Sequence, residues 1–78
     1  MNEQIQLRYG KGKYHLQSEM QEWAKEHIGP GKWRNLKPAP NVNYKWQMDS
    51  IFGNTFFYFE EEKYASWFAL RWPTDSHD

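Results

Sequence analysis

Carboxylates are the most densely grouped reactive side chains in this sequence. Glu60, Glu61 and Glu62 form one run, and Glu22 lies well upstream. Two carboxylates act as general acid and general base only where burial separates their pKa values, and no spacing here places two of them in a cleft. The run at 60–62 instead opens a helical pattern, where negative charge complements the positive end of the helix dipole. We therefore interpret these residues as helix-start and solubilising charges.

Hydroxyl and imidazole groups are too scattered in the sequence to indicate nucleophilic or metal chemistry. The candidates are Ser18, Ser50, Ser66, His15, His27 and His77. None of the serines stands in a nucleophile-elbow context, and the histidines belong to different expected elements without a zinc-ligand spacing. The sequence contains no cysteine, which excludes disulfides and thiolate chemistry. It predicts a protein that is not an enzyme and that carries no metal or cofactor.

The stretch 10–13 has the glycine and lysine content of a phosphate-binding loop. It lacks both the Walker spacing and the three glycines of a dinucleotide fingerprint. Arg8, Lys11, Lys13 and His15 form a local basic cluster there, which either contacts an anion or is a solvated turn. Over the whole chain ten Lys and Arg balance ten Asp and Glu, so net charge does not favour nucleic acid or a membrane.

Aromatic content is the unusual feature of the composition, at 19% of 78 residues. Large rings let a short chain bury enough area for one core, and Trp and Tyr are also enriched at interfaces. We expect a single domain over residues 1–78, with flexible ends at 1–4 and 74–78, and we keep both roles open for the rings. The longest apolar stretch is too short for a membrane span.

Two helices are predicted from apolar spacing. The first covers 19–28, with Ser18 and Gln21 as a capping box and Gly29 as its stop. Its apolar stripe consists of Met20, Trp23, Ala24, His27 and Ile28, and we expect His27 to be partly buried. The second helix covers 61–72 and ends at Pro73. Its stripe consists of Tyr64, Ala65, Phe68 and Trp72, with Ala69 beside it.

Strands are predicted at 5–9, where apolar and polar residues alternate, and in a hairpin over 43–59. Residues 31–37 are compatible with a further short strand. A hairpin turn at Gly53 and Asn54 would pair Met48 with Phe59. In that register Trp46, Met48, Phe57 and Phe59 share one face, against which the helices pack.

The opposite face of the hairpin combines polar and aromatic side chains. It carries Lys45, Gln47, Asp49, Ile51, Phe56 and Tyr58. A polar strand beside exposed rings is the composition of an open binding face. The alternative is that the N-terminal segment or a second copy of the protein covers it.

The run Gly53-Asn54-Thr55-Phe56-Phe57-Tyr58-Phe59, followed by acidic residues and an alanine-containing helix, resembles the third strand and second helix of RNA-recognition-motif domains. The resemblance implies that the ring of Phe56 lies on an open sheet face and stacks on a base, whereas Phe57 and Phe59 point to the core. The hairpin register gives the same pattern independently.

The last third of the chain is similar to small uncharacterised proteins of tailed bacteriophages. The shared segment reads Phe57-x-Phe59 and then Ala65-x-x-Phe68-Ala69-Leu70-Arg71-Trp72. The resemblance implies a phage-encoded accessory protein in the cytoplasm of the bacterial host or in the virion.

These observations predict an α+β two-layer sandwich. We expect an antiparallel sheet with two helices on one face, in the order β-α-β-β-α of a ferredoxin-like unit that lacks its last strand. The expected function is a non-enzymatic module that binds a host or virion protein through the aromatic face or the sheet edge. The alternatives are a single-stranded nucleic-acid-binding protein that uses aromatic stacking and a self-assembling virion component. The candidate binding residues are Phe56, Tyr58, Lys45, Gln47 and Arg34, and we expect no membrane partner.

Overall fold

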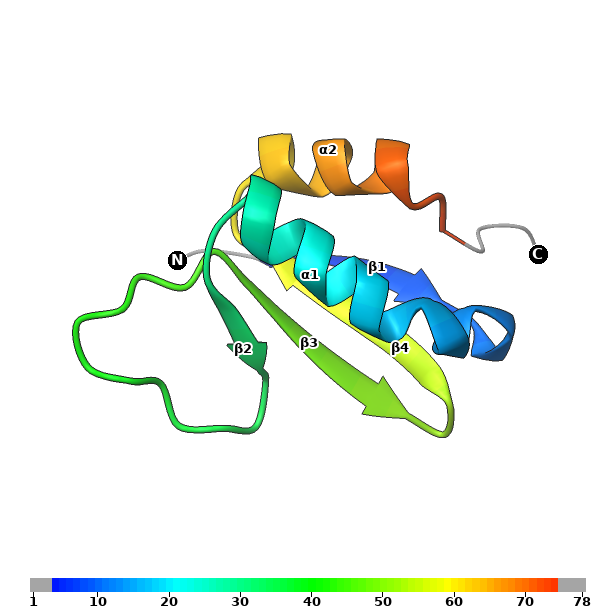
Figure 1. Ribbon diagram of the computed structural model, residues 1–78, viewed down its shortest axis with the longest axis horizontal. Coiled ribbons are helices and arrows are strands. Elements are labelled where there is room, and N and C mark those ends of the chain that lie inside the picture. Colours follow the sequence, from blue (N-terminus) through cyan, green and yellow to red (C-terminus); the bar gives the residue numbers. More distant parts are fainter. Residues whose placement is uncertain (1–3, 75–78) are drawn as a thin grey trace.

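The computed structural model describes residues 4–74 as an α+β fold with an open, mixed four-stranded sheet and two α-helices (Figure 1). The elements in chain order are β1 (Ile5–Tyr9), the 3-10 helix η1 (Lys11–Leu16), α1 (Gln17–His27), β2 (Gly31–Trp33), β3 (Trp46–Ile51), β4 (Asn54–Phe59) and α2 (Glu62–Arg71). The predicted strand at 5–9 is confirmed. Most of the tails expected to be flexible, 1–3 and 75–78, lies outside the described residues.

The sheet has the strand order β1-β4-β3-β2. β4 runs antiparallel to both of its neighbours, but β2 runs parallel to β3, so the prediction of a purely antiparallel sheet is wrong. The reason lies in the segment between β2 and β3. Parallel neighbours need a crossover of about a dozen residues, and residues 34–45 supply one without a helix. Backbone bonds from Lys45 N to Pro30 O and from Arg34 N to Met48 O anchor its two ends.

The hairpin turn consists of Phe52 and Gly53, so the prediction of Gly53 and Asn54 is wrong. Both turn residues have positive φ, 52° and 85°, as a type I′ turn requires. Phenylalanine rarely adopts that conformation, which is why the sequence favoured the pair containing Asn. Met48 therefore pairs with Phe57 rather than with Phe59. The shift is an even number of residues, so the predicted faces are unchanged.

Helix α1 begins without the predicted capping box. Its N-cap is Leu16, no side chain caps it, and the chain enters directly from η1 with Gln17 N bonded to Tyr14 O. The Gln17 side chain donates to Thr55 Oγ1 at 2.8 Å. The predicted stop is confirmed, since Gly29 has a φ of 144° and its N–H bonds Ala24 O at 3.0 Å. Helix α2 matches its predicted range within one residue at each end.

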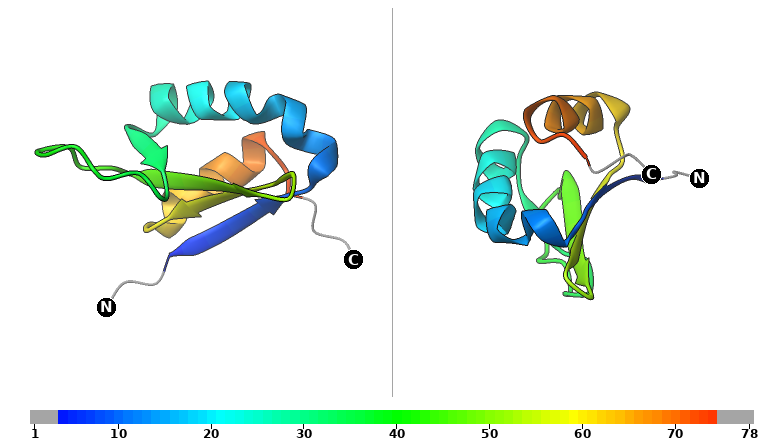
Figure 2. Two further views of the ribbon diagram at one scale, coloured as in Figure 1. Left: turned by 90° about the horizontal axis from the view of Figure 1, so that it is seen from below. Right: turned by 90° about the vertical axis from the view of Figure 1, so that its right-hand side faces the viewer.

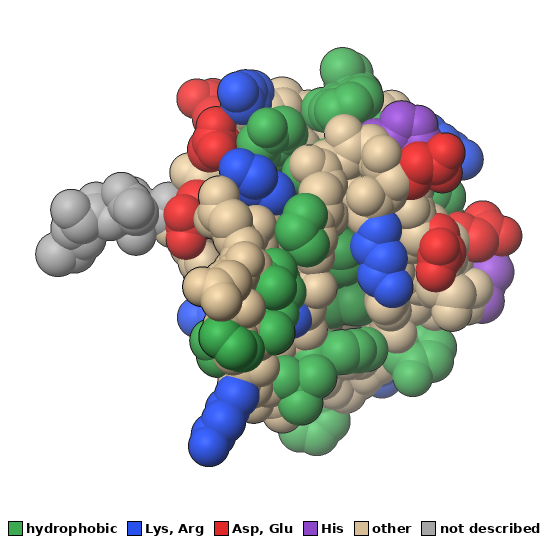
Figure 3. Space-filling view, turned by 60° about the vertical axis from the view of Figure 1, so that its left-hand side comes forward, with side chains coloured by type: hydrophobic (Ala, Val, Ile, Leu, Met, Phe, Trp, Pro, Cys, Tyr) green, Lys and Arg blue, Asp and Glu red, His purple; other side chains and the backbone are tan. Residues whose placement is uncertain are grey.

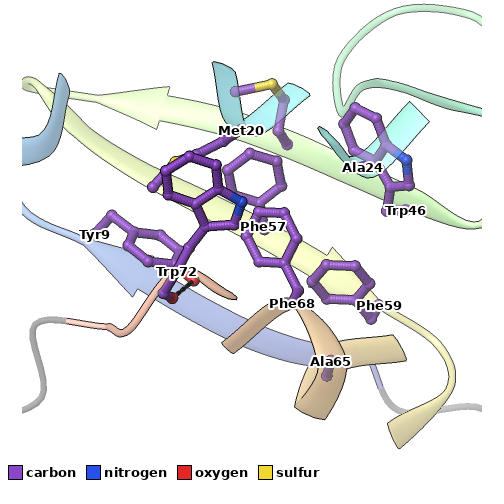
Figure 4. Close-up of a cluster of buried hydrophobic side chains, with 10 residues drawn as sticks. Tyr9, Met20, Ala24, Trp46, Phe57, Phe59, Ala65, Phe68 and Trp72 are labelled. Carbon is purple, nitrogen blue, oxygen red and sulfur yellow. Dashed lines mark hydrogen bonds between the residues drawn. The ribbon is translucent and has the colours of Figure 1, made fainter. Parts of the chain in front are cut away.

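One cluster of buried side chains joins the helices to the sheet (Figure 4). Its members are Tyr9, Met20, Ala24, Trp46, Met48, Phe57, Phe59, Ala65, Phe68 and Trp72. The predicted inward set on β3 and β4 is thus confirmed. Tyr9 adds a buried hydrogen bond from its hydroxyl to Trp72 O at 2.6 Å. His27 was expected to be partly buried; it is exposed instead and stacks on Trp23 with ring centroids 4.5 Å apart.

Figure 2 shows α1 and α2 on the same side of the sheet, with the other side of the strands bare of helices. The alternating burial of β3 and β4 agrees with this view. Along β4 the even-numbered residues are half-buried and the odd-numbered residues are buried. The fold therefore gives every second residue of the hairpin a core position and leaves its neighbours on the opposite face.

Candidate binding surface

The side of the sheet opposite the core carries four of the five sequence-predicted binding residues. We call this surface the outer sheet face and define it by Gln6, Arg8, Lys32, Arg34, Gln47, Asp49, Phe56 and Tyr58. Gln47 is the register partner of Tyr58 on β4 and of Lys32 on β2. Since paired residues in neighbouring strands project to the same side, the register alone brings these side chains together.

The guanidinium of Arg34 lies over the ring of Tyr58. The guanidinium carbon is 4.2 Å from the ring centroid, within the range of a cation–π contact. The same guanidinium donates from Nη1 to Gln4 Oε1 at 3.0 Å, and Gln6 Nε2 donates to the Tyr58 hydroxyl at 3.3 Å. Arg34 follows β2 at one edge of the sheet, whereas Gln4 and Gln6 belong to the β1 edge. A chain of side-chain contacts therefore crosses the whole outer sheet face.

The ammonium group of Lys32 anchors the backbone that carries Arg34. Lys32 Nζ donates to the carbonyl oxygens of Trp33, Arg34 and Leu36, at 3.2, 3.2 and 2.8 Å. One ammonium group with three acceptors closes the turn after β2 and holds the start of the Arg34 side chain in place. Such an arrangement lowers the entropy that Arg34 would lose on contacting a partner.

Phe56 is the second ring of this surface. It is half-buried and lies between Arg8 on β1 and Asp49 on β3 in the register of the sheet. Asp49 accepts a hydrogen bond from the Ser50 backbone N–H at 2.9 Å. Phe56 and Tyr58 thus form a row of two rings along β4 with polar residues on both flanks.

Carboxylates are scarce on the outer sheet face. It holds Arg8, Lys32 and Arg34 but a single carboxylate, Asp49. The other carboxylates within residues 4–74 lie on α1 or at 60–62, and basic residues also lie on both helices. In Figure 3 the acidic side chains form groups at the two sides of the view, with basic side chains beside them. The outer sheet face is therefore locally basic, which a count over the whole sequence could not reveal.

The remaining predicted basic contacts lie elsewhere. The stem of Lys45, the fifth predicted binding residue, packs against Gly29 at the connection between α1 and β2. The stem of Lys11 lies beside Gly53 at the hairpin turn, and Lys13 Nζ donates to Pro73 O at 3.2 Å. Sequence reasoning did not assign Gln6, Arg8 or Lys32 to this surface, although it named Arg8 in a basic cluster. The alternation in 5–9 puts Gln6 and Arg8 on one side of their strand, but only the pairing of β1 with β4 places that side on the outer sheet face.

The part of the chain that the structure describes contains neither a cluster of metal-ligating side chains nor a membrane-spanning helix. Across 4–74, no group of three or more histidine, aspartate or glutamate side chains is placed to hold a metal ion. Within that range, no helix combines the length and the apolar composition that crossing a bilayer requires.

Comparison of the chain with family models, with curated proteins and with solved structures finds no match. The resemblances to RNA-recognition-motif domains and to tailed-phage proteins therefore stay predictions.

Proposed function

We propose that this protein is a non-enzymatic binding module, a phage-encoded accessory protein that binds a protein of the bacterial host or of the virion. Its contact surface is the outer sheet face together with the adjacent β1 edge. The observation that carries this proposal is the ordered array of Arg34, Tyr58, Gln6 and Gln4 on a side of the sheet without a helix. The site of action is the host cytoplasm or the virion.

The chemistry of the outer sheet face supports a protein partner. Tyr and Arg are enriched among the residues that contribute most to protein interfaces, especially where neighbouring groups exclude water. Here Phe56 and Tyr58 supply apolar area, Arg34 supplies a planar charged group, and glutamines surround them. Because the basic residues outnumber the single carboxylate, the partner surface is expected to be acidic.

The β1 edge offers a second mode of contact. β1 and β3 are both antiparallel to β4, which lies between them, as in the split βαβ arrangement. On that basis we propose that the fold is a ferredoxin-like unit without its final strand. The absent strand would leave β1 as an unprotected edge, and such edges pair with strands of partners or of second copies.

A double substitution tests the proposal. Phe56→Ala/Tyr58→Ala removes both rings from the outer sheet face, and Tyr14→Ala/Val42→Ala removes two exposed apolar side chains that lie on η1 and in the crossover between β2 and β3. Each tagged protein is incubated with a bacterial lysate, and the retained proteins are quantified by mass spectrometry. We expect a partner that is retained by the wild type and the control variant and lost with the Phe56/Tyr58 variant. Equal retention by all three proteins would contradict the assignment.

A single-stranded nucleic acid is the second candidate partner, favoured by the local excess of basic residues on the outer sheet face and by the guanidinium over the Tyr58 ring. Bases stack on aromatic rings, while Arg8 and Arg34 would contact phosphates. Titration with a single-stranded oligonucleotide at several salt concentrations tests this alternative. Use of two cations predicts a slope of log K against log salt of about −1.4. Absence of binding, or binding without salt dependence, would exclude it.

Light scattering on the same samples separates these candidates from a self-assembling virion component. A monomer leaves the outer sheet face available for a different partner. A stable dimer or larger species that dissociates in the Phe56→Ala/Tyr58→Ala variant would assign this face to contacts between copies instead.

A further inference from the structure

A groove runs between the two helices, on the side of the molecule away from the outer sheet face. It has a volume of about 330 Å³ and is lined chiefly by Glu19, Glu22, Trp23 and Glu26 of α1 and by Arg71 and Trp72 at the end of α2. Trp23 meets Trp67 of α2 in an edge-to-face contact with centroids 5.4 Å apart, which fixes the spacing of the helices. Figures 1 and 2 both show α1 and α2 side by side.

The groove has an apolar floor and an apolar rim. Trp23 is half-buried and Trp72 is 7% exposed, so the rings close the bottom of the groove. On the rim, Trp67 is 42% exposed and packs edge-on against Trp23. An exposed indole that continues the floor of a groove is apolar area available to a partner.

One wall of the groove is acidic. Glu19, Glu22 and Glu26 recur at i, i+3 and i+7 along one side of α1, and all three are exposed. Within residues 4–74, no ion pair joins any of them to a basic side chain. The one basic residue that lines the groove, Arg71, lies over the Trp72 ring with its guanidinium carbon 3.9 Å from the centroid. The groove is therefore net negative, with three carboxylates against one guanidinium.

We propose that this groove binds a cationic amphipathic helix of a partner protein. The apolar side of that helix would contact Trp23 and Trp67, and its lysine or arginine residues would face the three glutamates. Helix α1 has 11 residues, about 16 Å at about 1.5 Å per residue, which matches a partner segment of three turns. The negative wall disfavours nucleic acid and anionic lipid at this site, whereas an apolar groove beside regularly spaced charges is how helices are recognised. The proposal does not depend on the outer sheet face.

A synthetic peptide of about 14 residues, long enough for some 21 Å of helix, serves as the probe. It consists of lysine and leucine in a helical amphipathic pattern, and a second peptide has the same composition in scrambled order. Binding is measured by isothermal titration calorimetry against the wild type and two matched variants. One variant changes Glu19, Glu22 and Glu26 to Gln, and the control changes Glu60, Glu61 and Glu62 to Gln. Both alter net charge equally, but only the first alters the groove.

We expect the groove variant to bind the patterned peptide at least about tenfold more weakly, and the control variant to stay within about twofold of the wild type. Trp67→Ala should also weaken binding, by about fivefold, because it removes an exposed apolar contact beside Trp23. Equal losses in the two charge variants would show non-specific attraction and overturn the proposal. Equal binding of the scrambled peptide, or no effect of Trp67→Ala, would overturn it as well. The Phe56→Ala/Tyr58→Ala variant should bind the peptide normally, which separates this test from that of the proposed function.

Discussion

The two faces of the β3–β4 hairpin differ in what the same residue types do. Phe57 and Phe59 are 0% exposed and belong to the core, whereas Phe56 and Tyr58, one position along, are half-buried on the outer sheet face. Phe57 contacts Phe68 with centroids 4.6 Å apart, while Tyr58 contacts the guanidinium of Arg34. Within one strand, therefore, the odd-numbered rings stabilise the core, and the even-numbered rings lie on the face where we propose that a partner binds.

The largest effect is expected in the core. Phe57→Ala should lower the free energy of unfolding by about 3 to 5 kcal/mol, because it removes a fully buried ring and leaves a cavity. A domain of this size has a total stability of about 4 to 12 kcal/mol, so the variant is close to unfolded. Urea denaturation followed by far-ultraviolet circular dichroism measures the loss. A change below about 1 kcal/mol would mean that Phe57 is not a core residue.

The second prediction concerns Gly31, whose backbone packs closely against the Trp46 ring. A Cβ on Gly31 would overlap the indole of Trp46, whose Nε1 donates to Gly29 O at 2.8 Å. Gly31→Ala should therefore destabilise the protein by about 1 to 3 kcal/mol through overpacking. Gly12→Ala is the matched control, because a Cβ there meets nothing within 4 Å. Thermal unfolding compares the two, and similar melting temperatures would contradict the close approach at Gly31.

An effect of similar size is expected from one buried hydroxyl, that of Tyr9. Tyr9→Phe keeps the ring, which packs edge-on against Phe57 and Phe68, but removes the donor to Trp72 O. Leaving a buried carbonyl without this partner should cost about 1 to 3 kcal/mol. Denaturant unfolding measures the loss. A neutral result would show that the carbonyl finds another donor.

The smallest effect is expected at the hairpin turn, where the change should be stabilising. Phe52 is 88% exposed and has a φ of 52°, so its ring contributes little to packing and its backbone is strained. Asn tolerates this conformation, and Asn-Gly is the preferred pair for a type I′ turn. Phe52→Asn should raise stability by about 0.5 to 1 kcal/mol, measured as a shift in the urea midpoint. A loss of stability would mean that the Phe52 ring makes a contact important for folding.

The parts of the fold that follow from local periodicity were predictable from the sequence. The predicted faces of β3 and β4 are correct although the predicted turn position is wrong. The reason is that a shift in register by an even number of residues leaves each side chain on the same face. The missed features depend on longer-range geometry. The predicted capping box at Ser18 and Gln21 is absent because η1 continues directly into α1. The parallel pairing of β2 depends on a crossover whose sequence has no periodic pattern.

The candidate site was predictable only in part for the same reason. Phe56, Tyr58 and Gln47 follow from the alternation in the hairpin. The addition of Gln6 and Arg8 requires the pairing of β1 with β4, and the contact between Arg34 and Tyr58 requires the path of the chain after β2. The local excess of basic residues on the outer sheet face arises from these same non-local pairings.

The most direct test of this division is denaturant unfolding of the Phe56→Ala/Tyr58→Ala variant beside Phe57→Ala under one set of conditions. Two half-buried rings on the outer sheet face should together contribute about 1 to 2 kcal/mol, so the double variant should stay folded and lose less stability than the single core variant. A loss for the double variant equal to or greater than that for Phe57→Ala would show that both faces of the hairpin belong to the core and would contradict the account.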